Sequence, residues 1–288
     1  MKRLLTSTRG ITNSATILIL LLVSTASAII LPYTQMAYAH TFTGDESASF
    51  MSVIKILQAE ANLVQSNLVS NATLAQDHAK SVVDVVNGNH TFGVLPDEVS
   101  ENNKRVAADV IHTANALQTA VKSKPTPTQT DLKTKVDNFN ATLQEAVAVR
   151  LPKDAASNST ITGLATKDLV NETLRQYGYA FGVANVKGGS SNNETAKSSV
   201  PGSSTTIMNM SAYQSAQALA SQTQGMLFQA KSVVPSNATS ATKEAIAKLG
   251  TDLSQLKSII DEKGPYDKVA SLVQKTIYPD IDAAFHLR

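Results

Sequence analysis

Residues 47–68 read SASFMSVIKILQAEANLVQSNL, and the spacing of their apolar side chains indicates the fold class. The apolar side chains recur mostly every three or four residues, at Phe50, Val53, Ile54, Leu57, Ala61, Val64 and Leu68. This spacing places one apolar stripe on one side of an α-helix. Asp45 or Ser47 offers a side-chain oxygen that caps the first turn. The stretch therefore predicts an amphipathic helix that starts at about Ser47.

The same helical spacing returns along nearly the whole chain. Apolar stripes run from Leu74 to Val86, Val106 to Val121, Leu132 to Val147 and Leu164 to Phe181, and further helices are predicted at about 208–234, 240–262 and 266–286, with Pro279 starting a final short turn. The stretch NGNHTFGVLPDE (87–98) is interpreted as a loop, because it contains Asn-Gly and a proline. No segment alternates with the period of a β-strand over a useful length. We predict an all-α protein built as an antiparallel helical bundle of about eight amphipathic helices, with two tandem bundles as an alternative.

A change of composition divides the predicted helices into two groups. Residues 187–204, KGGSSNNETAKSSVPGSS, contain almost nothing that a core would bury, which is typical of a flexible linker. The resulting organisation is an N-terminal segment at 1–39, a helical bundle at 40–186, a linker at 187–206 and a C-terminal helical hairpin or bundle at 207–288.

Two parts of the chain also resemble each other. Residues 105–154 and 216–267 share the order helix, polar turn with proline, helix, and then Pro-x-Asp. The stripe Val136, Phe139, Leu143, Ala146 corresponds to Ile246, Leu249, Leu253, Leu256 at a constant shift of 110 residues. If this similarity reflects duplication, it implies two related antiparallel bundles in tandem. Helical hairpins resemble each other in any case, so both explanations stay open.

The first 39 residues have the pattern of an export signal. Lys2, Arg3 and Arg9 precede an apolar run from Ala15 to Leu31, and Ala37-Tyr38-Ala39 supplies a small-x-small cleavage site. An alternative cut after Ala28 follows the apolar run more closely. A third alternative is an uncleaved anchor, since the 17-residue run at 15–31 is at the short limit for a membrane span. All three place most of the chain outside the cytoplasm, either secreted, or at the cell surface or in a pseudo-periplasm.

Asn-x-Ser/Thr triplets point to the same location. They occur at Asn71, Asn89, Asn140, Asn158, Asn171, Asn193, Asn209 and Asn237. Such triplets are acceptors for N-linked glycans when they lie on the surface of an exported protein. Asn140 and Asn171 fall within predicted helices, so their use requires that they face outward.

Charge and composition exclude several classes. Three of the 25 basic residues precede residue 40, which leaves 22 basic and 23 acidic side chains and a net charge of −1 in the remainder. No basic stripe of a nucleic-acid binder is present. The absence of cysteine excludes a disulfide scaffold and a thiolate metal site. No G-x-S-x-G motif and no glycine-rich phosphate loop occurs, so we expect no enzyme and no nucleotide cofactor.

Histidine is the scarcest candidate metal-ligating side chain in the sequence, which contains five. A cut after Ala39 would free the α-amine of His40, which together with its imidazole forms a chelate suited to Cu(II). A second imidazole would come from His78, His90 or His112, and no spacing rule selects among them. His78 lies in the apolar stripe of the second helix, a position that favours a half-buried helix-interface histidine bonded to a neighbour over a metal ligand. His90 and His286 are expected at the surface.

The segment AHTFTGDESASFMSVI (39–54), together with AQDHAKSVVDVV (75–86), resembles the mature start of uncharacterised exported helical proteins of ammonia-oxidising archaea. The resemblance covers chiefly residues 39–86. It implies an extracytoplasmic location and brings no assigned function with it.

Three functional hypotheses follow. The first is an exported, glycosylated, non-enzymatic module that binds an unknown protein or surface-layer partner, or serves as a structural accessory, and meets a membrane only through an uncleaved N-terminal segment. The second is a copper-binding accessory or chaperone that uses His40 and His78. The third is a bundle that binds or senses a small molecule between its helices.

Overall fold

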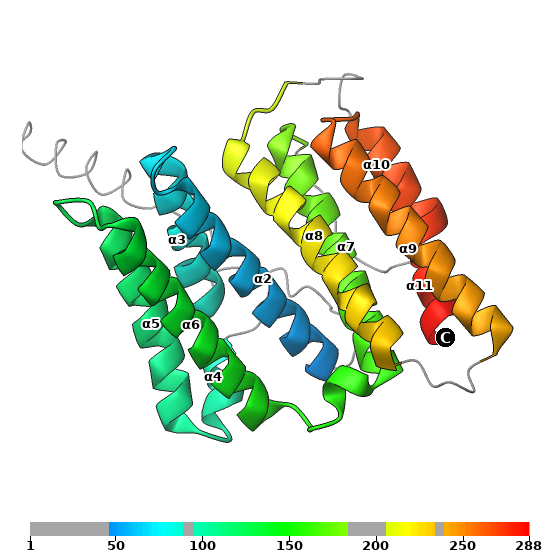
Figure 1. Cartoon of the computed structure of the whole chain (residues 1–288), viewed down its shortest axis with the longest axis horizontal. Coiled ribbons are helices and arrows are strands. Elements are labelled where there is room, and N and C mark those ends of the chain that lie inside the picture. Colours follow the sequence, from blue (N-terminus) through cyan, green and yellow to red (C-terminus); the bar gives the residue numbers. More distant parts are fainter. Residues whose placement is uncertain (1–45, 89–94, 184–205, 234–238, 288) are drawn as a thin grey trace, which may run out of the picture. The chain divides into compact units, whose positions relative to one another are not determined.

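The computed structural model describes residues 46–88, 95–183, 206–233 and 239–287 (Figure 1). The regular structure within these ranges is helical, without strands, and the packed helices make antiparallel contacts. The all-α fold class predicted from the apolar stripes is therefore confirmed. The predicted export segment and residues 187–205 of the predicted linker lie outside the described residues.

The long helices begin and end close to the predicted positions. They are α2 (Glu46–Asn67), α3 (Ala72–Val86), α5 (Lys104–Lys122), α6 (Gln129–Arg150), α7 (Ser159–Ala180), α8 (Met210–Val233) and α9 (Ser240–Asp261). Two short elements, α4 (Leu95–Ser100) and the 3₁₀ turn η1 (Ala155–Ser157), lie between them. The last helix consists of α10 (Tyr266–Leu272), the π-helical turn η2 (Val273–Ile277) and α11 (Tyr278–Phe285).

Local sequence explains where several helices start. The side-chain oxygens of Asn71, Asn103, Thr128, Asn158 and Thr239 each accept a hydrogen bond from a backbone N–H in the first turn of the following helix. These bonds satisfy donors that have no partner within the helix. Short polar residues ahead of an apolar stripe therefore fix the helix boundaries.

One local prediction needs correction. The segment 87–98, interpreted as a loop, contains the start of α4, in which Leu95 and Val99 are buried. Pro96 does not prevent this, because a proline in the first turn of a helix removes no intrahelical hydrogen bond. Pro279 lies in the first turn of α11, so the final short turn starts there as predicted. The chain passes through η2, where the Tyr278 N–H bonds to the Val273 carbonyl five residues back, and helical structure continues into α11.

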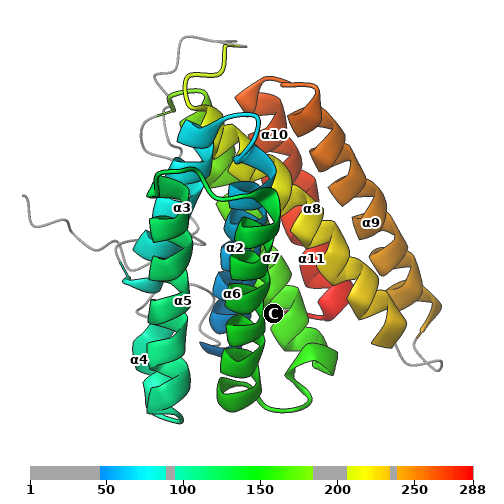
Figure 2. The same cartoon turned by 60° about the vertical axis from the view of Figure 1, so that its left-hand side comes forward.

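The first four long helices close into a ring. α2 packs on α3, α3 on α5, α5 on α6, and α6 returns to α2 (Figure 2). Their buried apolar side chains form one hydrophobic cluster, with Phe50, Leu57, Leu117 and Phe139 among its fully enclosed members. α4 packs against one end of this ring, on α5 and α6. We call this arrangement the first ring.

The remaining helices form a second ring. α7 packs on α8, α8 on α9, α9 on α11, and α11 returns to α7. Their hydrophobic cluster includes Tyr177, Leu249 and Ile281. α7 was assigned from the sequence to the bundle at 40–186, but it packs most extensively on α8. Residues 184–205 therefore connect two neighbouring helices of the second ring, and the rings divide between α6 and α7.

The two rings are in contact through α2, which packs on α7 and α8, and through α3, which packs on α8. Leu219 and Met226 of α8 are buried in the hydrophobic cluster of the first ring. The helices from α2 onward accordingly belong to one compact unit.

The internal similarity of the sequence does not follow the order of the rings. α6 and α9 are both 22-residue helices that start after a threonine cap, and both matched stripes are buried. α6 is nevertheless the fourth long helix of the first ring, whereas α9 is the third of the second ring. The similarity pairs helices that occupy different places, so common helical-hairpin chemistry accounts for it without duplication of whole rings.

Candidate functional site: a buried polar network between the rings

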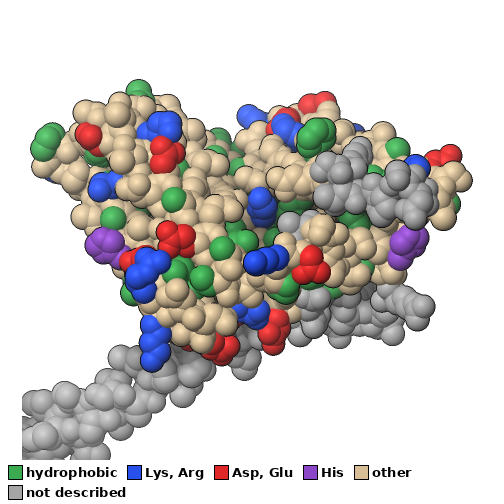
Figure 3. Space-filling model, turned by 60° about the horizontal axis from the view of Figure 1, so that its bottom comes forward, with side chains coloured by type: hydrophobic (Ala, Val, Ile, Leu, Met, Phe, Trp, Pro, Cys, Tyr) green, Lys and Arg blue, Asp and Glu red, His purple; other side chains and the backbone are tan. Residues whose placement is uncertain are grey.

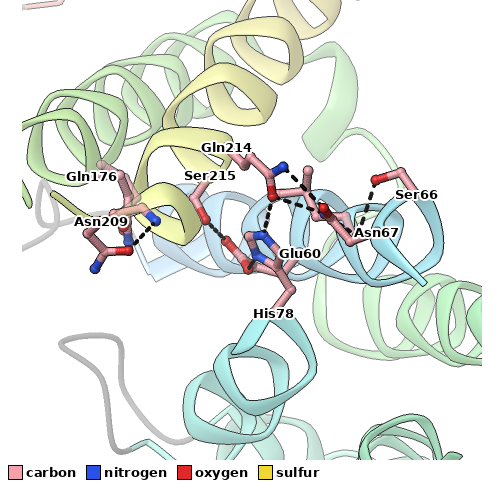
Figure 4. Close-up of polar contacts among 11 residues, drawn as sticks. Glu60, Ser66, Asn67, His78, Gln176, Asn209, Gln214 and Ser215 are labelled. Carbon is pink, nitrogen blue, oxygen red and sulfur yellow. Dashed lines mark hydrogen bonds and ion pairs between the residues drawn. The ribbon is translucent and has the colours of Figure 1, made fainter. Parts of the chain in front are cut away.

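Polar side chains gather where α2 and α3 of the first ring meet α8 of the second (Figure 4). Five residues form what we call the interface network: Glu60, Asn67, His78, Gln214 and Ser215. All except the half-buried Gln214 are at most 4% exposed. Buried polar groups of this kind need partners, because an unpaired one costs a large part of its hydration energy.

Glu60 and His78 form the centre of the network. Glu60 lies on the buried side of α2 between Leu57 and Val64, and its Oε2 is 2.8 Å from Nδ1 of His78 on α3. Ser215 of α8 donates a hydrogen bond to the other carboxylate oxygen, Oε1, at 2.5 Å. Figure 4 shows Glu60 between these two partners. Both oxygens of the buried Glu60 carboxylate are therefore hydrogen-bonded, one to a side chain of the first ring and the other to a side chain of the second ring.

The second nitrogen of His78 faces the second ring. Its Nε2 is 2.9 Å from Oε1 of Gln214. Gln214 and Asn67 also form a reciprocal amide pair, in which each side-chain nitrogen donates to the oxygen of the other. Asn67 Nδ2 donates a further bond to the backbone carbonyl of Leu63 at 2.9 Å.

The Leu63 carbonyl fixes the polarity of this chain of bonds. A carbonyl oxygen only accepts, so the Asn67 nitrogen must point toward it, and the Asn67 oxygen then faces the Gln214 nitrogen. This orientation leaves Gln214 Oε1 toward His78, where Nε2 must donate. The other ring nitrogen faces the Glu60 carboxylate. With Glu60 ionised, both nitrogens of His78 donate, which is the pattern of an imidazolium cation.

Electrostatics agree with a charged His78. Burial alone would lower the pKa of the ring, but the hydrogen bond to Glu60 and the negative charge of Glu60 outweigh it, with smaller contributions from Gln214 and Asp77. The pKa of His78 is therefore raised above its ordinary value of 6.5. Glu60 and His78 form a buried ion pair. Each ring nitrogen and each carboxylate oxygen of this pair has a hydrogen-bond partner within the protein.

The network differs from a hydrolytic triad although it contains a serine, a histidine and a carboxylate. In such a triad the serine hydroxyl bonds to the imidazole, which then removes its proton. Here Ser215 bonds to Glu60, and Gln214 occupies the imidazole nitrogen that a nucleophile would need. Ser215 is also only 3% exposed. The arrangement is that of a structural cluster.

The predicted copper site depends on His40, which lies outside the described residues, and it therefore stays a prediction. His90 also lies outside the described residues. His78 has both nitrogens engaged, while His112 and His286 are exposed. Within 46–88, 95–183, 206–233 and 239–287, no three His, Asp or Glu side chains gather closely enough to hold a metal ion.

Three sequon asparagines cap helices at the surface. Asn71, Asn158 and Asn209 are exposed. Each accepts backbone hydrogen bonds through Oδ1 in the first turn of α3, α7 and α8, respectively. A cap of this kind uses the side-chain oxygen, whereas a glycan is joined to the side-chain nitrogen, so both roles fit one residue.

The two sequons inside helices are enclosed. Asn140 and Asn171 are half-buried, and the threonines of their triplets, Thr142 and Thr173, are buried at 9% and 0% exposure. Tyr278 also donates a hydrogen bond to Asn171 Oδ1 at 3.3 Å. Asn89, Asn193 and Asn237 lie outside the described residues.

A second buried ion pair lies on α7. Arg175 donates from Nε to Glu172 at 2.6 Å and stacks over the ring of Tyr179, with 5.0 Å between the guanidinium carbon and the ring centroid. Burial alone would lower the pKa of Arg175, but the charge of Glu172 and its hydrogen bonds raise it. Arg175 therefore stays charged inside the fold.

Sequence reasoning found His78 but missed the other four residues of the interface network. Glu60 carried a readable signal, because it stands three residues after Leu57 and four before Val64, a position that the stripe reserves for an apolar side chain. Gln214 and Ser215 carried none, since they are 136 and 155 positions away from the side chains that they contact.

On the face drawn in Figure 3, basic and acidic side chains are interspersed, without a region of one sign. None of the described helices combines the length and apolar character needed to cross a bilayer. Comparison with known proteins finds no matching family model, no matching curated protein and no matching solved structure.

Proposed function

We propose that this protein is an exported, glycan-bearing helical module that acts outside the cytoplasm by binding a protein or surface-layer partner, or as a structural accessory, and not as an enzyme. The observation that carries the proposal is the placement of Asn71, Asn158 and Asn209. Three sequons lie exposed at helix starts, with their side-chain oxygens already engaged in capping.

The buried network supports the non-enzymatic part of the proposal. Its serine, histidine and carboxylate bond to one another and to amides in an order that stabilises the contact between helices. The preceding export-like segment, with Lys2, Arg3 and Arg9 ahead of an apolar run, supports the location.

Mass spectrometry of native protein tests the proposal. We expect a processed N-terminus at His40 or Ile29, or a membrane-retained chain, and glycans on at least one of Asn71, Asn158 and Asn209. We expect the triplets at Asn140 and Asn171, whose threonines are buried, to be unmodified, because an acceptor needs access to both the asparagine and the hydroxyl residue.

Two variants separate glycan attachment from capping. Asn158→Asp keeps an oxygen that caps α7 but removes the acceptor nitrogen, and Thr160→Ala removes the sequon hydroxyl and leaves the cap. Both should lose a glycan at residue 158 without loss of helicity. Recovery of an unprocessed and unglycosylated chain from the cytoplasm would overturn the proposal.

A further inference from the structure

The interface network joins the two rings through side chains that come from both of them. Glu60, Asn67 and His78 belong to the first ring, and Gln214 and Ser215 belong to the second. We propose that this network is a pH-responsive latch, which holds α8 against α2 and α3 while His78 carries its proton and weakens when the proton leaves. This inference does not depend on where the protein is located or on whether it carries glycans.

The network fits only one arrangement of protons on His78, with both ring nitrogens protonated. The Leu63 carbonyl orients Asn67, Asn67 orients Gln214, and Gln214 then presents an acceptor oxygen to His78 Nε2. Nδ1 faces the acceptor oxygen of Glu60 at the same time. A ring placed between two acceptors must donate from both nitrogens.

Loss of one proton from His78 leaves two acceptors facing each other. A neutral imidazole has one N–H, and the charge of Glu60 keeps it at Nδ1. The lone pair of Nε2 then faces the lone pairs of Gln214 Oε1. Rotating the Gln214 amide would remove this conflict but would turn its nitrogen away from Asn67 Oδ1, and rotating Asn67 in turn would place two oxygens together at Leu63. No rearrangement of the amides keeps every bond.

The hydrogen bond that is lost with the proton is one that joins the two rings. The Glu60–His78 bond lies within the first ring and persists with a neutral ring, and the Ser215–Glu60 bond remains as well. The bond that fails, from His78 to Gln214, crosses between the rings. Loss of the proton therefore weakens the contact between the rings more than the packing inside either ring.

The direction of the pH response follows from the charges around His78. Among the described residues, the charges that act on it are Glu60 from α2 and Asp77 from α3 itself, both negative. α8 presents the uncharged Gln214 and Ser215, and α4 and α5, which also pack on α3, add no charge that acts on the ring. The pKa of His78 is raised above 6.5, so the latch is closed in mild acid and weakens as the pH rises through that raised value.

The chain is suited to a direct measurement because it contains no cysteine. Cysteines are introduced in the full-length chain at the exposed positions His112 on α5 and Gln255 on α9, one in each ring, and labelled for fluorescence energy transfer. A control pair at His112 and Asn62 lies within the first ring. Transfer is recorded from pH 5 to 9 with pH-insensitive dyes, and the His78 ring is titrated in parallel by NMR.

We expect transfer between the rings to change with a midpoint that coincides with the titration of His78, while transfer within the first ring stays constant. Gln214→Leu removes the opposing oxygen and leaves the Glu60–His78 pair in place, so its inter-ring signal should be independent of pH. Gln214→Glu places a carboxylate opposite Nε2 and should move the midpoint to higher pH.

Three results would overturn the latch. The first is an inter-ring signal that is constant from pH 5 to 9. The second is a signal that changes in the same way in Gln214→Leu. The third is a parallel change of the control pair within the first ring, which would indicate general unfolding. These variants alter the half-buried Gln214 and leave the buried pair intact, so the test does not require that a variant of His78 folds.

Discussion

At the scale of single residues, Glu60 and His78 show how a charge is accommodated in this interior. Each would be strongly unfavourable alone, and each is bonded on both sides. A buried pair of this kind adds little net stability compared with an apolar pair, but removal of one partner leaves the other without compensation. The consequence is measurable in a single substitution.

We expect Glu60→Gln to lower the free energy of unfolding by about 3–5 kcal/mol, the range for breaking a buried ion pair. The exposed pair Lys133–Asp137 on α6 provides the control, because the same chemical change in Asp137→Asn should cost below about 1 kcal/mol. Urea denaturation followed by circular dichroism measures both. Equal effects in the two variants would contradict the structural role assigned to Glu60.

Two helix-interior glycines offer a second residue-scale comparison. A Cβ at Gly163 of α7 would lie 2.5 Å from the Cβ of Phe285, whereas a Cβ at Gly225 of α8 would meet nothing within 4 Å. We expect Gly163→Ala to destabilise by about 1–3 kcal/mol through overpacking. Gly225→Ala should stabilise by about 0.5–1 kcal/mol, because alanine loses less backbone entropy in a helix. Thermal unfolding of the pair checks the opposite signs.

At the scale of elements, helix starts are determined by short polar residues. Asn158 caps α7 by accepting bonds from the N–H groups of Thr160 and Ile161 at 3.0 and 3.2 Å. α7 belongs to the second ring and also packs on α2 of the first ring. Fraying of its first turn should therefore affect the whole fold.

We expect Asn158→Ala to cost about 0.5–2 kcal/mol of stability, the usual effect of removing an N-cap. Asn158→Asp keeps the accepting oxygen and should remain within a few tenths of a kcal/mol of the original chain. The measurement uses unglycosylated recombinant protein, so that a glycan does not contribute. If both substitutions destabilise α7 equally, the cap is not the source of the effect.

The end of the chain shows an element that a local pattern does not reveal. Pro279 has no N–H and cannot continue the bonding of a regular α-helix. In the structure the π turn η2 takes up the mismatch directly before it, and Val273 and Ile277 stay buried. Pro279 thus starts the final short helix α11 as predicted, and the π turn before it, which was not predicted, keeps the chain helical.

At the scale of the whole molecule, stability should depend on pH through His78. The raised pKa means that the folded state binds a proton more tightly than the unfolded chain. The stabilisation from His78 is therefore complete below about pH 6.5, the ordinary pKa of an unfolded histidine, and is lost as the pH rises through the raised folded value.

We expect the free energy of unfolding to fall as the pH rises above about 6.5, the ordinary pKa of histidine, and this fall to be reduced in His78→Gln. Urea denaturation at a series of pH values measures it. His112→Gln is the matched control, because His112 is exposed on α5 and its loss should leave the pH dependence unchanged. A fall of equal size in all three proteins would assign the pH dependence to other groups.

His78, Asn158 and the segment at 187–206 show how far the structure could be predicted from the sequence. His78 was recognisable as an interface residue because it stands within an apolar stripe of its own helix. Asn158 was recognisable as a sequon, but its role as a cap required the position at which α7 begins. The division into two rings was hidden, because the polar segment at 187–206 looks like a boundary and yet connects two helices that pack on each other.

The sequence by itself determined the helices and their buried faces, because hydrogen bonding within a helix is local and the 3.6-residue period of apolar side chains can be read along one segment. Only the tertiary structure decided which helices form each ring and which side chains surround Glu60 and His78. Those contacts join residues up to 155 positions apart, and their choice depends on the packing of whole faces against one another.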